Sequence, residues 1–139
     1  LALVRGEVHR RARIAGLSER LRRGLLQLGY DVSCSESQII PLIAGPESET
    51  ARLRDALEAH GVIGSVFCAP ATPRNRSLVR LCVHNGLDNA DIDHIIEVCL
   101  RIRDQVQPDR WPTRPSQSKY WAAVQTMGNR IPSSVEKKL

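Results

Sequence analysis

The residue best suited to do chemistry in this 139-residue sequence is an arginine in the middle of an apolar strand. Residues 78–84 alternate, which places Val79, Leu81 and Val83 on one face and Leu78, Arg80, Cys82 and His84 on the other. A guanidinium among apolar neighbours is costly unless it meets a carboxylate or a phosphate. Arg80 is therefore a candidate for binding the carboxylate of a small ligand. The alternative, a sheet-surface arginine paired with a nearby acid, is the commoner case.

The segment before that strand is stiff and polar. It contains Pro70, Ala71, Thr72 and Pro73, and two prolines so close together make such a segment move as a unit. It is either a lid over the Arg80 face or a plain connection between strands. Ser35 and Ser37, ahead of the first strand, fit a ligand oxygen site or, more commonly, a turn. His84 has no orienting partner in the sequence and is a weak catalytic candidate.

Other kinds of chemistry have no suitable residues in the body of the chain. All three lysines (Lys119, Lys137 and Lys138) are near the C-terminus, so the first 118 residues hold no amine nucleophile. Four cysteines and four histidines are scattered, with no C-x-x-C or H-x-x-x-H pair. We therefore expect no metal site. Without a secretory signal, we also expect reduced thiols and a cytoplasmic protein.

The net charge of +5 is unevenly distributed along the chain. Residues 1–29 carry +5, residues 30–104 carry −4 and residues 105–139 carry +4. A nucleic-acid-binding domain more often has a basic patch interleaved with stacking aromatics on one folded face. The acidic middle of the chain has neither, so we expect no nucleic-acid partner. The apolar runs fall far short of the ~18–20 residues that span a bilayer, so we expect no membrane partner.

The elements that must position Arg80 can be outlined from periodicity. Apolar residues every three or four positions predict an amphipathic helix over residues 4–28. Strands are predicted at residues 38–44, 62–69 and 78–84, the first at a sheet edge because Pro41 lacks a backbone donor. A second helix follows Gly45, and a third begins after the capping residue Asp88. The order α-β-α-β-β-α predicts an α+β fold, a small and mainly antiparallel three-stranded sheet covered on one face by helices. Residues 1–104 form this domain, and residues 105–139 are expected to be a loosely ordered tail.

Several short motifs resemble one enzyme family. They are SESQIIPLI at residues 35–43, Gly61-Val62, PATP at residues 70–73 and Arg80-Leu81. Together they resemble the C-terminal domain of the α-oxoamine synthases, pyridoxal-phosphate enzymes of fold type I that include 8-amino-7-oxononanoate synthase. GSVFC at residues 64–68 and IIEVC at residues 95–99 are most similar to the α-hydroxyketone autoinducer synthases of quorum sensing. The resemblance spans about residues 5–104 and identifies residues 1–104 as the small domain, beginning with its linking helix.

The resemblance implies specific roles. Arg80 matches the family arginine that holds the carboxylate of the amino-acid substrate, and Pro70 to Pro73 match a mobile active-site loop. Leu78 and Leu87 replace an arginine and a histidine common in relatives, which leaves the amino acid and the acyl chain open. The parent enzyme joins an amino acid to an acyl-CoA, binds pyridoxal phosphate through a large domain, and acts as a homodimer.

The large domain of the family supplies the Schiff-base lysine and the other cofactor-binding groups. We therefore assign no catalytic, cofactor-binding or metal-binding residue here. We expect this chain alone to bind no cofactor productively and to be inactive. The alternative is a free-standing α+β module that binds a ligand or a partner without catalysis.

Overall fold

The computed structural model describes residues 7–33 and 35–112. Its elements, in chain order, are α2 (Val8–Gln27), β1 (Ile39–Gly45), α3 (Glu47–Glu58), β2 (Ser65–Phe67), β3 (Ser77–Cys82), α4 (Asn89–Val106) and the 3-10 turn η1 (Pro108–Arg110). Up to α4, this is the predicted order α-β-α-β-β-α. The predicted α+β fold is confirmed.

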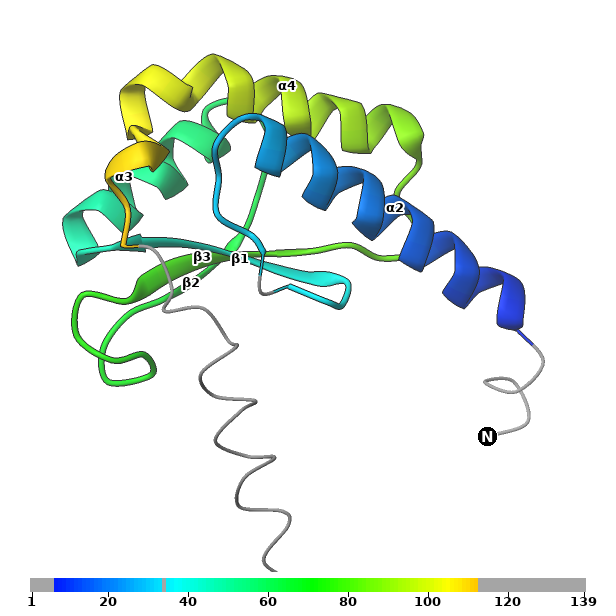
Figure 1. Ribbon diagram of the computed structural model, residues 1–139, viewed down its shortest axis with the longest axis horizontal. Coiled ribbons are helices and arrows are strands. Elements are labelled where there is room, and N and C mark those ends of the chain that lie inside the picture. The colour runs from blue at the N-terminus through cyan, green and yellow to red at the C-terminus, as the bar shows by residue number, and fades with distance from the viewer. Residues whose placement is uncertain (1–6, 34, 113–139) are drawn as a thin grey trace, which may run out of the picture.

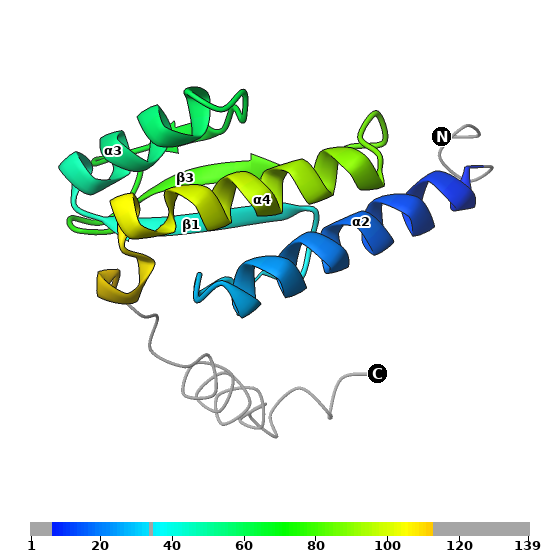
Figure 2. The same cartoon turned by 90° about the horizontal axis from the view of Figure 1, so that it is seen from above.

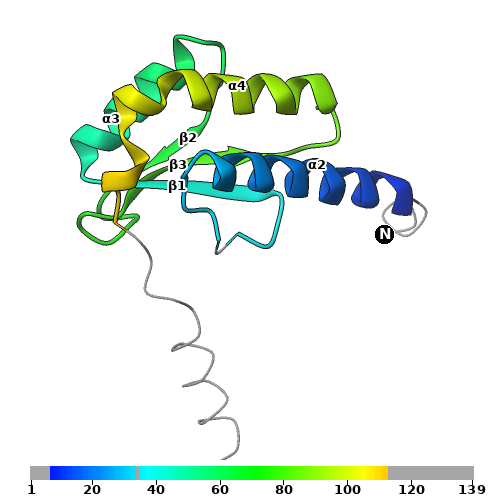
Figure 3. The same cartoon turned by 45° about the horizontal axis from the view of Figure 1, so that its top comes forward.

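The three strands form one antiparallel sheet in the order β1-β3-β2. β3 is therefore the central strand, and β1, which contains Pro41, lies at an edge as predicted. Helices α2, α3 and α4 all lie on the same face of this sheet (Figures 1 and 3). The opposite face is not covered by any element of the described chain. This one-sided cover gives the sheet two chemically different faces.

The hydrophobic core lies between the sheet and the helices. Val79 of β3 is fully buried there, together with Leu21 of α2, Leu53 of α3 and Ile92 of α4. α2 and α4 run side by side over the sheet (Figures 1 and 2). Each large aliphatic side chain buried in this way contributes roughly 1.5–3 kcal/mol. The predicted apolar stripes thus pack the helices onto the sheet.

The helix ends follow the local sequence. Gly29, directly after α2, has a φ of +86°, the left-handed conformation that glycine adopts without strain. Asp88 begins α4 with a capping box, in which its side chain accepts from the Asp91 N–H and the Asp91 side chain accepts from the Asp88 N–H. The second strand in the sequence is shorter than predicted, because β2 covers Ser65–Phe67 rather than residues 62–69. The Val62 N–H is instead bonded to Leu57 O at the end of α3.

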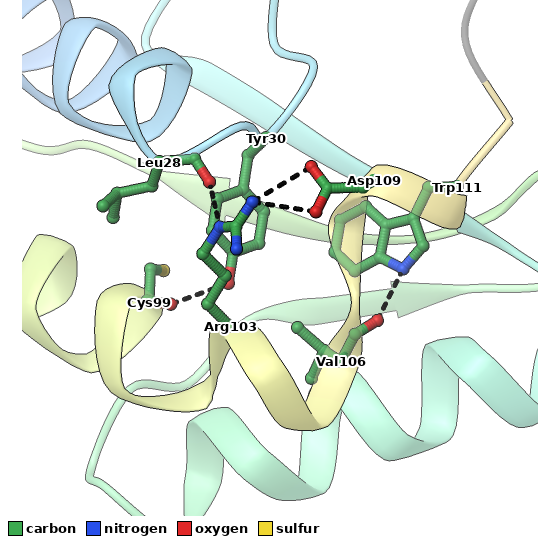
Figure 4. Close-up of polar contacts among 7 residues, drawn as sticks. All are labelled: Leu28, Tyr30, Cys99, Arg103, Val106, Asp109 and Trp111. Atoms are coloured by element: carbon green, nitrogen blue, oxygen red, sulfur yellow. Dashed lines mark hydrogen bonds and ion pairs between the residues drawn. The ribbon is translucent and has the colours of Figure 1, made fainter.

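Ordered structure extends beyond the predicted domain end at residue 104. α4 continues to Val106, and η1 follows after Gln107, whose φ is +49°. At this corner Arg103 donates from Nε to Leu28 O at 2.8 Å and from Nη2 to the Asp109 carboxylate at 2.8 Å. Figure 4 shows both contacts. One side chain thereby joins the end of α2, α4 and η1. Residues 113–139, the rest of the predicted tail, lie outside the described residues.

An aromatic pair completes this corner. Tyr30 is buried, and its hydroxyl donates to Cys99 O at 2.8 Å. The Trp111 ring meets the Tyr30 ring edge to face, with centroids 5.5 Å apart, and its indole N–H donates to Val106 O at 3.0 Å (Figure 4). Pro112 then lies against Gly45 at the end of β1. We refer to residues 103–112 as the C-terminal latch, because they fasten α4 to the end of α2.

Candidate functional site

The open face of the sheet has Arg80 near its centre. The strand register aligns Arg80 with Pro41 of β1 on one side and Ser65 of β2 on the other. Val79 and Leu81, its neighbours along β3, are buried beneath the helices. The Arg80 side chain therefore lies on the uncovered face, as the alternation predicts. The central strand of a hydrogen-bonded sheet is a rigid place from which to present a charge.

Within the part of the chain that the structure describes, Arg80 makes none of the pairings expected of a structural arginine. Among the described residues, its guanidinium has no ion pair and no hydrogen bond. Nε is buried and has no hydrogen-bond partner in residues 7–33 and 35–112. The guanidinium carbon lies over the Phe67 ring, 4.5 Å from its centroid. The commoner interpretation, a surface arginine paired with a nearby acid, therefore finds no such acid among the described residues.

An unpaired buried donor in a native structure needs an explanation. A buried polar group without a partner costs about 1–3 kcal/mol, and more when it is charged. A carboxylate is the acceptor that matches a guanidinium most closely, because two parallel N–H···O bonds can form. The half-buried setting of Arg80 strengthens such a contact relative to a fully solvated one. The arrangement is thus suited to bind a carboxylate.

The predicted loop joins β2 to β3 at one end of the sheet, and Pro70 to Pro73 lie within it (Figure 1). The Thr72 N–H donates to Cys68 O at 3.2 Å, which closes a turn inside the loop. Thr72 Oγ1 and Arg76 Nη1 are both buried without a hydrogen-bond partner in the described chain. Among the described residues, buried polar atoms without a hydrogen-bond partner are therefore found both at Arg80 and in the loop that precedes β3.

The remaining candidates have structural roles or lie apart from Arg80. Ser35 Oγ donates to Ile39 O at 2.7 Å, and Ser37 Oγ accepts from the Ile39 N–H at 3.1 Å, so both serines shape a turn. His84 follows the end of β3, and its Nδ1 accepts from the Gly86 N–H. His84 lines a separate cavity of about 190 Å³ with His94 of α4. The structure therefore does not join the serines or His84 to Arg80.

The thiols provide no reactive cluster in this region. Cys99 is buried, and that burial raises the pKa of its thiol to about 12. Cys82 is exposed and Cys68 is half-buried, and both are free thiols. Among residues 7–33 and 35–112, no group of three or more His, Cys, Asp and Glu side chains could hold a metal ion. Cys34 lies outside the described residues.

Sequence reasoning missed the partner of Arg80. Phe67 contacts the guanidinium because β2 and β3 pair with Phe67 opposite Leu78. This register cannot be read from two short apolar segments joined by a loop. The only sequence signal was an aromatic residue within a predicted strand next to the strand of Arg80.

The fold and the site together define a small one-sided α+β domain that presents, from its open face, an arginine with no ion pair among the described residues. A family model described as aminotransferase class I and II matches residues 6–98. The chain belongs to this family.

Several individual proteins are similar to this chain in sequence or in structure. The CAI-1 autoinducer synthase of Vibrio campbellii is 38% identical over 99 residues, which cover 71% of this chain and 25% of that protein. The 8-amino-7-oxononanoate synthase of Gluconacetobacter diazotrophicus is 31% identical over 86 residues, covering 62% of this chain and 22% of that protein. A structure of serine palmitoyltransferase (SPT) with its PLP internal aldimine has a TM-score of 0.67 at 21% identity, over 71% of this chain and 25% of that chain. The predicted resemblance to the α-oxoamine synthases is confirmed.

The matched region is a part of a larger protein in each of these relatives, since the chain spans about a quarter of their length. Pyridoxal phosphate is held in its enzymes through a lysine, and none of the described residues is a lysine, because all three lysines follow residue 118. None of the described helices is long and apolar enough to cross a membrane.

Proposed function

We propose that this chain supplies the substrate-carboxylate clamp of a pyridoxal-phosphate-dependent acyl-CoA:amino-acid C-acyltransferase of the α-oxoamine synthase type. The observation that carries the proposal is Arg80, a half-buried guanidinium on the open sheet face with no anionic partner among the described residues. The family membership and the similarity to an autoinducer synthase support the reaction class. The alternative of a free-standing binding module shares the ligand contact but not the catalysis.

Arg80 has a binding and orienting role in this proposal. Its two-pronged contact fixes both oxygens of an amino-acid carboxylate, which also fixes the direction of the bond from the carboxylate to the α-carbon. Pyridoxal phosphate, held by the large domain, supplies the electron sink for the chemistry at that carbon. In this proposal the groups that make and break bonds belong to the large domain, so we expect this chain alone to be inactive.

The open face of the sheet also serves as the surface that meets the rest of the enzyme. Ile39 is exposed there, and Pro41, Ile43 and Leu78 are half-buried, so apolar side chains surround Arg80. A large domain against this face would exclude water and bring its own groups near the guanidinium. The homodimer and the acyl-CoA substrate implied by the resemblance belong to the same proposal.

The loop that contains Pro70 to Pro73 acts as a lid in this proposal. It begins directly after β2 and ends at β3, so it borders the face that presents Arg80. Thr72 Oγ1 and Arg76 Nη1, which lack a hydrogen-bond partner among the described residues, offer further hydrogen bonds to a bound ligand. The two prolines restrict bending inside the segment, so closure takes place through its two ends.

Binding of an amino acid to the full chain tests the clamp. Ligand-observed NMR with L-alanine is compared with L-alaninamide, which has the same side chain but no carboxylate. We expect binding of L-alanine only, weakened about tenfold in Arg80→Lys because an ammonium cannot reproduce the two-pronged contact. Equal binding of the acid and the amide, or an unchanged affinity in Arg80→Lys, would reject the clamp.

Mixing the full chain with pyridoxal phosphate tests the claim that catalysis resides elsewhere. We expect the visible absorption of the mixture to match that of a lysine-free control peptide. An additional band in the wild-type chain that is lost when Lys119, Lys137 and Lys138 are replaced by arginine would contradict the assignment of this group to the large domain.

A further inference from the structure

Phe67 and Arg80 are neighbours across two strands on the uncovered side of the sheet. Ser65 of β2 is aligned with Arg80 of β3, and Phe67 is aligned with Leu78. Phe67 therefore lies diagonally across from Arg80, a spacing that an aromatic ring and a long side chain can bridge. Their contact is the guanidinium carbon over the ring, 4.5 Å from its centroid. No other polar or aromatic contact of the guanidinium is present among the described residues.

We propose that Phe67 is a positioning residue that holds the Arg80 guanidinium ready for a carboxylate. The inference rests on the proposed function, because it concerns the same clamp. It goes further by naming the group that orients the clamp before the ligand arrives. Phe67 itself touches neither the substrate nor the cofactor in this proposal.

The chemistry of the contact explains why a ring suits this task better than an acid. A glutamate or aspartate would hold the arginine by accepting its N–H bonds, and it would compete with the ligand for the same donors. An aromatic ring attracts the cation through its face and accepts none of those in-plane bonds. Arg80 is thereby restrained while its N–H groups stay free, as the unpaired Nε indicates.

The ring also restricts the direction of approach. Because Phe67 covers one side of the guanidinium, a ligand must reach the N–H groups from the edge, where a planar carboxylate forms two parallel bonds. A flexible arginine loses side-chain entropy when it binds, and prior restraint reduces that loss. The contribution is of the size of a cation–π contact, which corresponds to about three- to tenfold in affinity.

NMR of the Arg80 side chain in the full 139-residue chain tests the proposal. Phe67→Leu and Phe67→Met remove the ring but keep an apolar residue, and Phe67→Tyr keeps the ring. Ile63→Leu is a matched apolar change at a residue that is 83% exposed and precedes β2. In both ringless variants we expect the Nε–Hε signal of Arg80 to lose its ring-current shift and its restricted motion. We expect the affinity for L-alanine to fall about three- to tenfold in the ringless variants and to stay unchanged in Phe67→Tyr and Ile63→Leu.

The outcomes separate this proposal from the clamp itself. If either folded ringless variant keeps the wild-type Arg80 signal, or keeps the wild-type affinity for L-alanine, the positioning role is overturned. If the wild-type chain does not bind L-alanine at all, the proposed clamp fails. The positioning role is overturned with it, because there is then no ligand for which Phe67 prepares Arg80. If Phe67→Leu binds L-alanine with the wild-type affinity although its Arg80 signal changes, only the positioning role fails.

Discussion

Replacing Trp111 with alanine tests whether the C-terminal latch is part of the folded domain. Trp111 follows η1, and its indole packs edge to face on the buried Tyr30 while donating to Val106 O. The substitution removes both contacts and leaves the backbone of α4 in place. We expect a clear loss of stability, because Tyr30 in turn is hydrogen-bonded to Cys99 O in the middle of α4.

The magnitude follows from the two contacts. An aromatic pair contributes about 0.5–1.5 kcal/mol beyond its buried area, and a side-chain hydrogen bond contributes about 0.5–1.5 kcal/mol net. The free energy of unfolding should therefore fall by about 1–3 kcal/mol in Trp111→Ala. For a domain of this size, each kcal/mol lowers the Tm by about 4–8 °C.

Urea denaturation of the full chain, followed by far-ultraviolet circular dichroism, measures the effect. Trp111→Phe keeps a ring against Tyr30 but loses the indole N–H, so it should lose only the hydrogen-bond share of about 0.5–1.5 kcal/mol. Leu100→Ala, at a residue of α4 that is 56% exposed, is the matched control and should change stability by less than about 0.5 kcal/mol. A loss in Trp111→Ala no larger than in Leu100→Ala would refute the latch.

Three further predictions concern the rest of the domain. Gly64→Ala should lower the free energy of unfolding by about 1–3 kcal/mol, because the added Cβ would lie 2.4 Å from Val79 Cγ1. Gly16→Ala has open space around it and should stabilise α2 by about 0.5–1 kcal/mol. Thermal unfolding that ranks the two variants in the opposite order would contradict the packing. Asp88→Ala removes the capping box of α4 and should cost about 1 kcal/mol, whereas Asp88→Asn should largely retain it. Because burial raises the pKa of the Cys99 thiol to about 12, the folded chain keeps a proton that the unfolded chain releases above about pH 9. The free energy of unfolding should therefore fall as the pH rises from about 9 towards about 12, and Cys99→Ala should flatten that slope; equal slopes in both proteins would exclude this linkage.

Most of the fold could be predicted because its local signals agree with one another. Val79 and Leu81 alternate with Arg80, and this alternation alone assigns the arginine to the face away from the helices. Pro41 indicates an edge strand because it cannot donate to a second neighbour, and Asp88 marks a helix start because its carboxylate can accept from a free N–H. Each of these inferences needs only residues that are close in sequence.

The parts that could not be predicted depend on distant residues. The Phe67–Arg80 contact requires the register between β2 and β3, which side-chain alternation does not determine. The latch depends on Arg103 reaching Leu28 O and on Trp111 meeting Tyr30, pairs that are far apart in the chain. Because the composition changes after residue 104, the sequence gives no sign that Trp111 packs against Tyr30.

The carboxylate clamp on Arg80 is tested most directly by following the Nε–Hε signals of all arginines while the full chain is titrated with L-alanine and, separately, with L-alaninamide. We expect the Arg80 signal alone to move and to saturate with the acid, and we expect the amide to move no signal. Exposed arginines such as Arg54, which is already paired with Asp55, should not respond. An Arg80 signal that stays in place while the exposed arginines shift, or that responds equally to the amide, would contradict the carboxylate clamp.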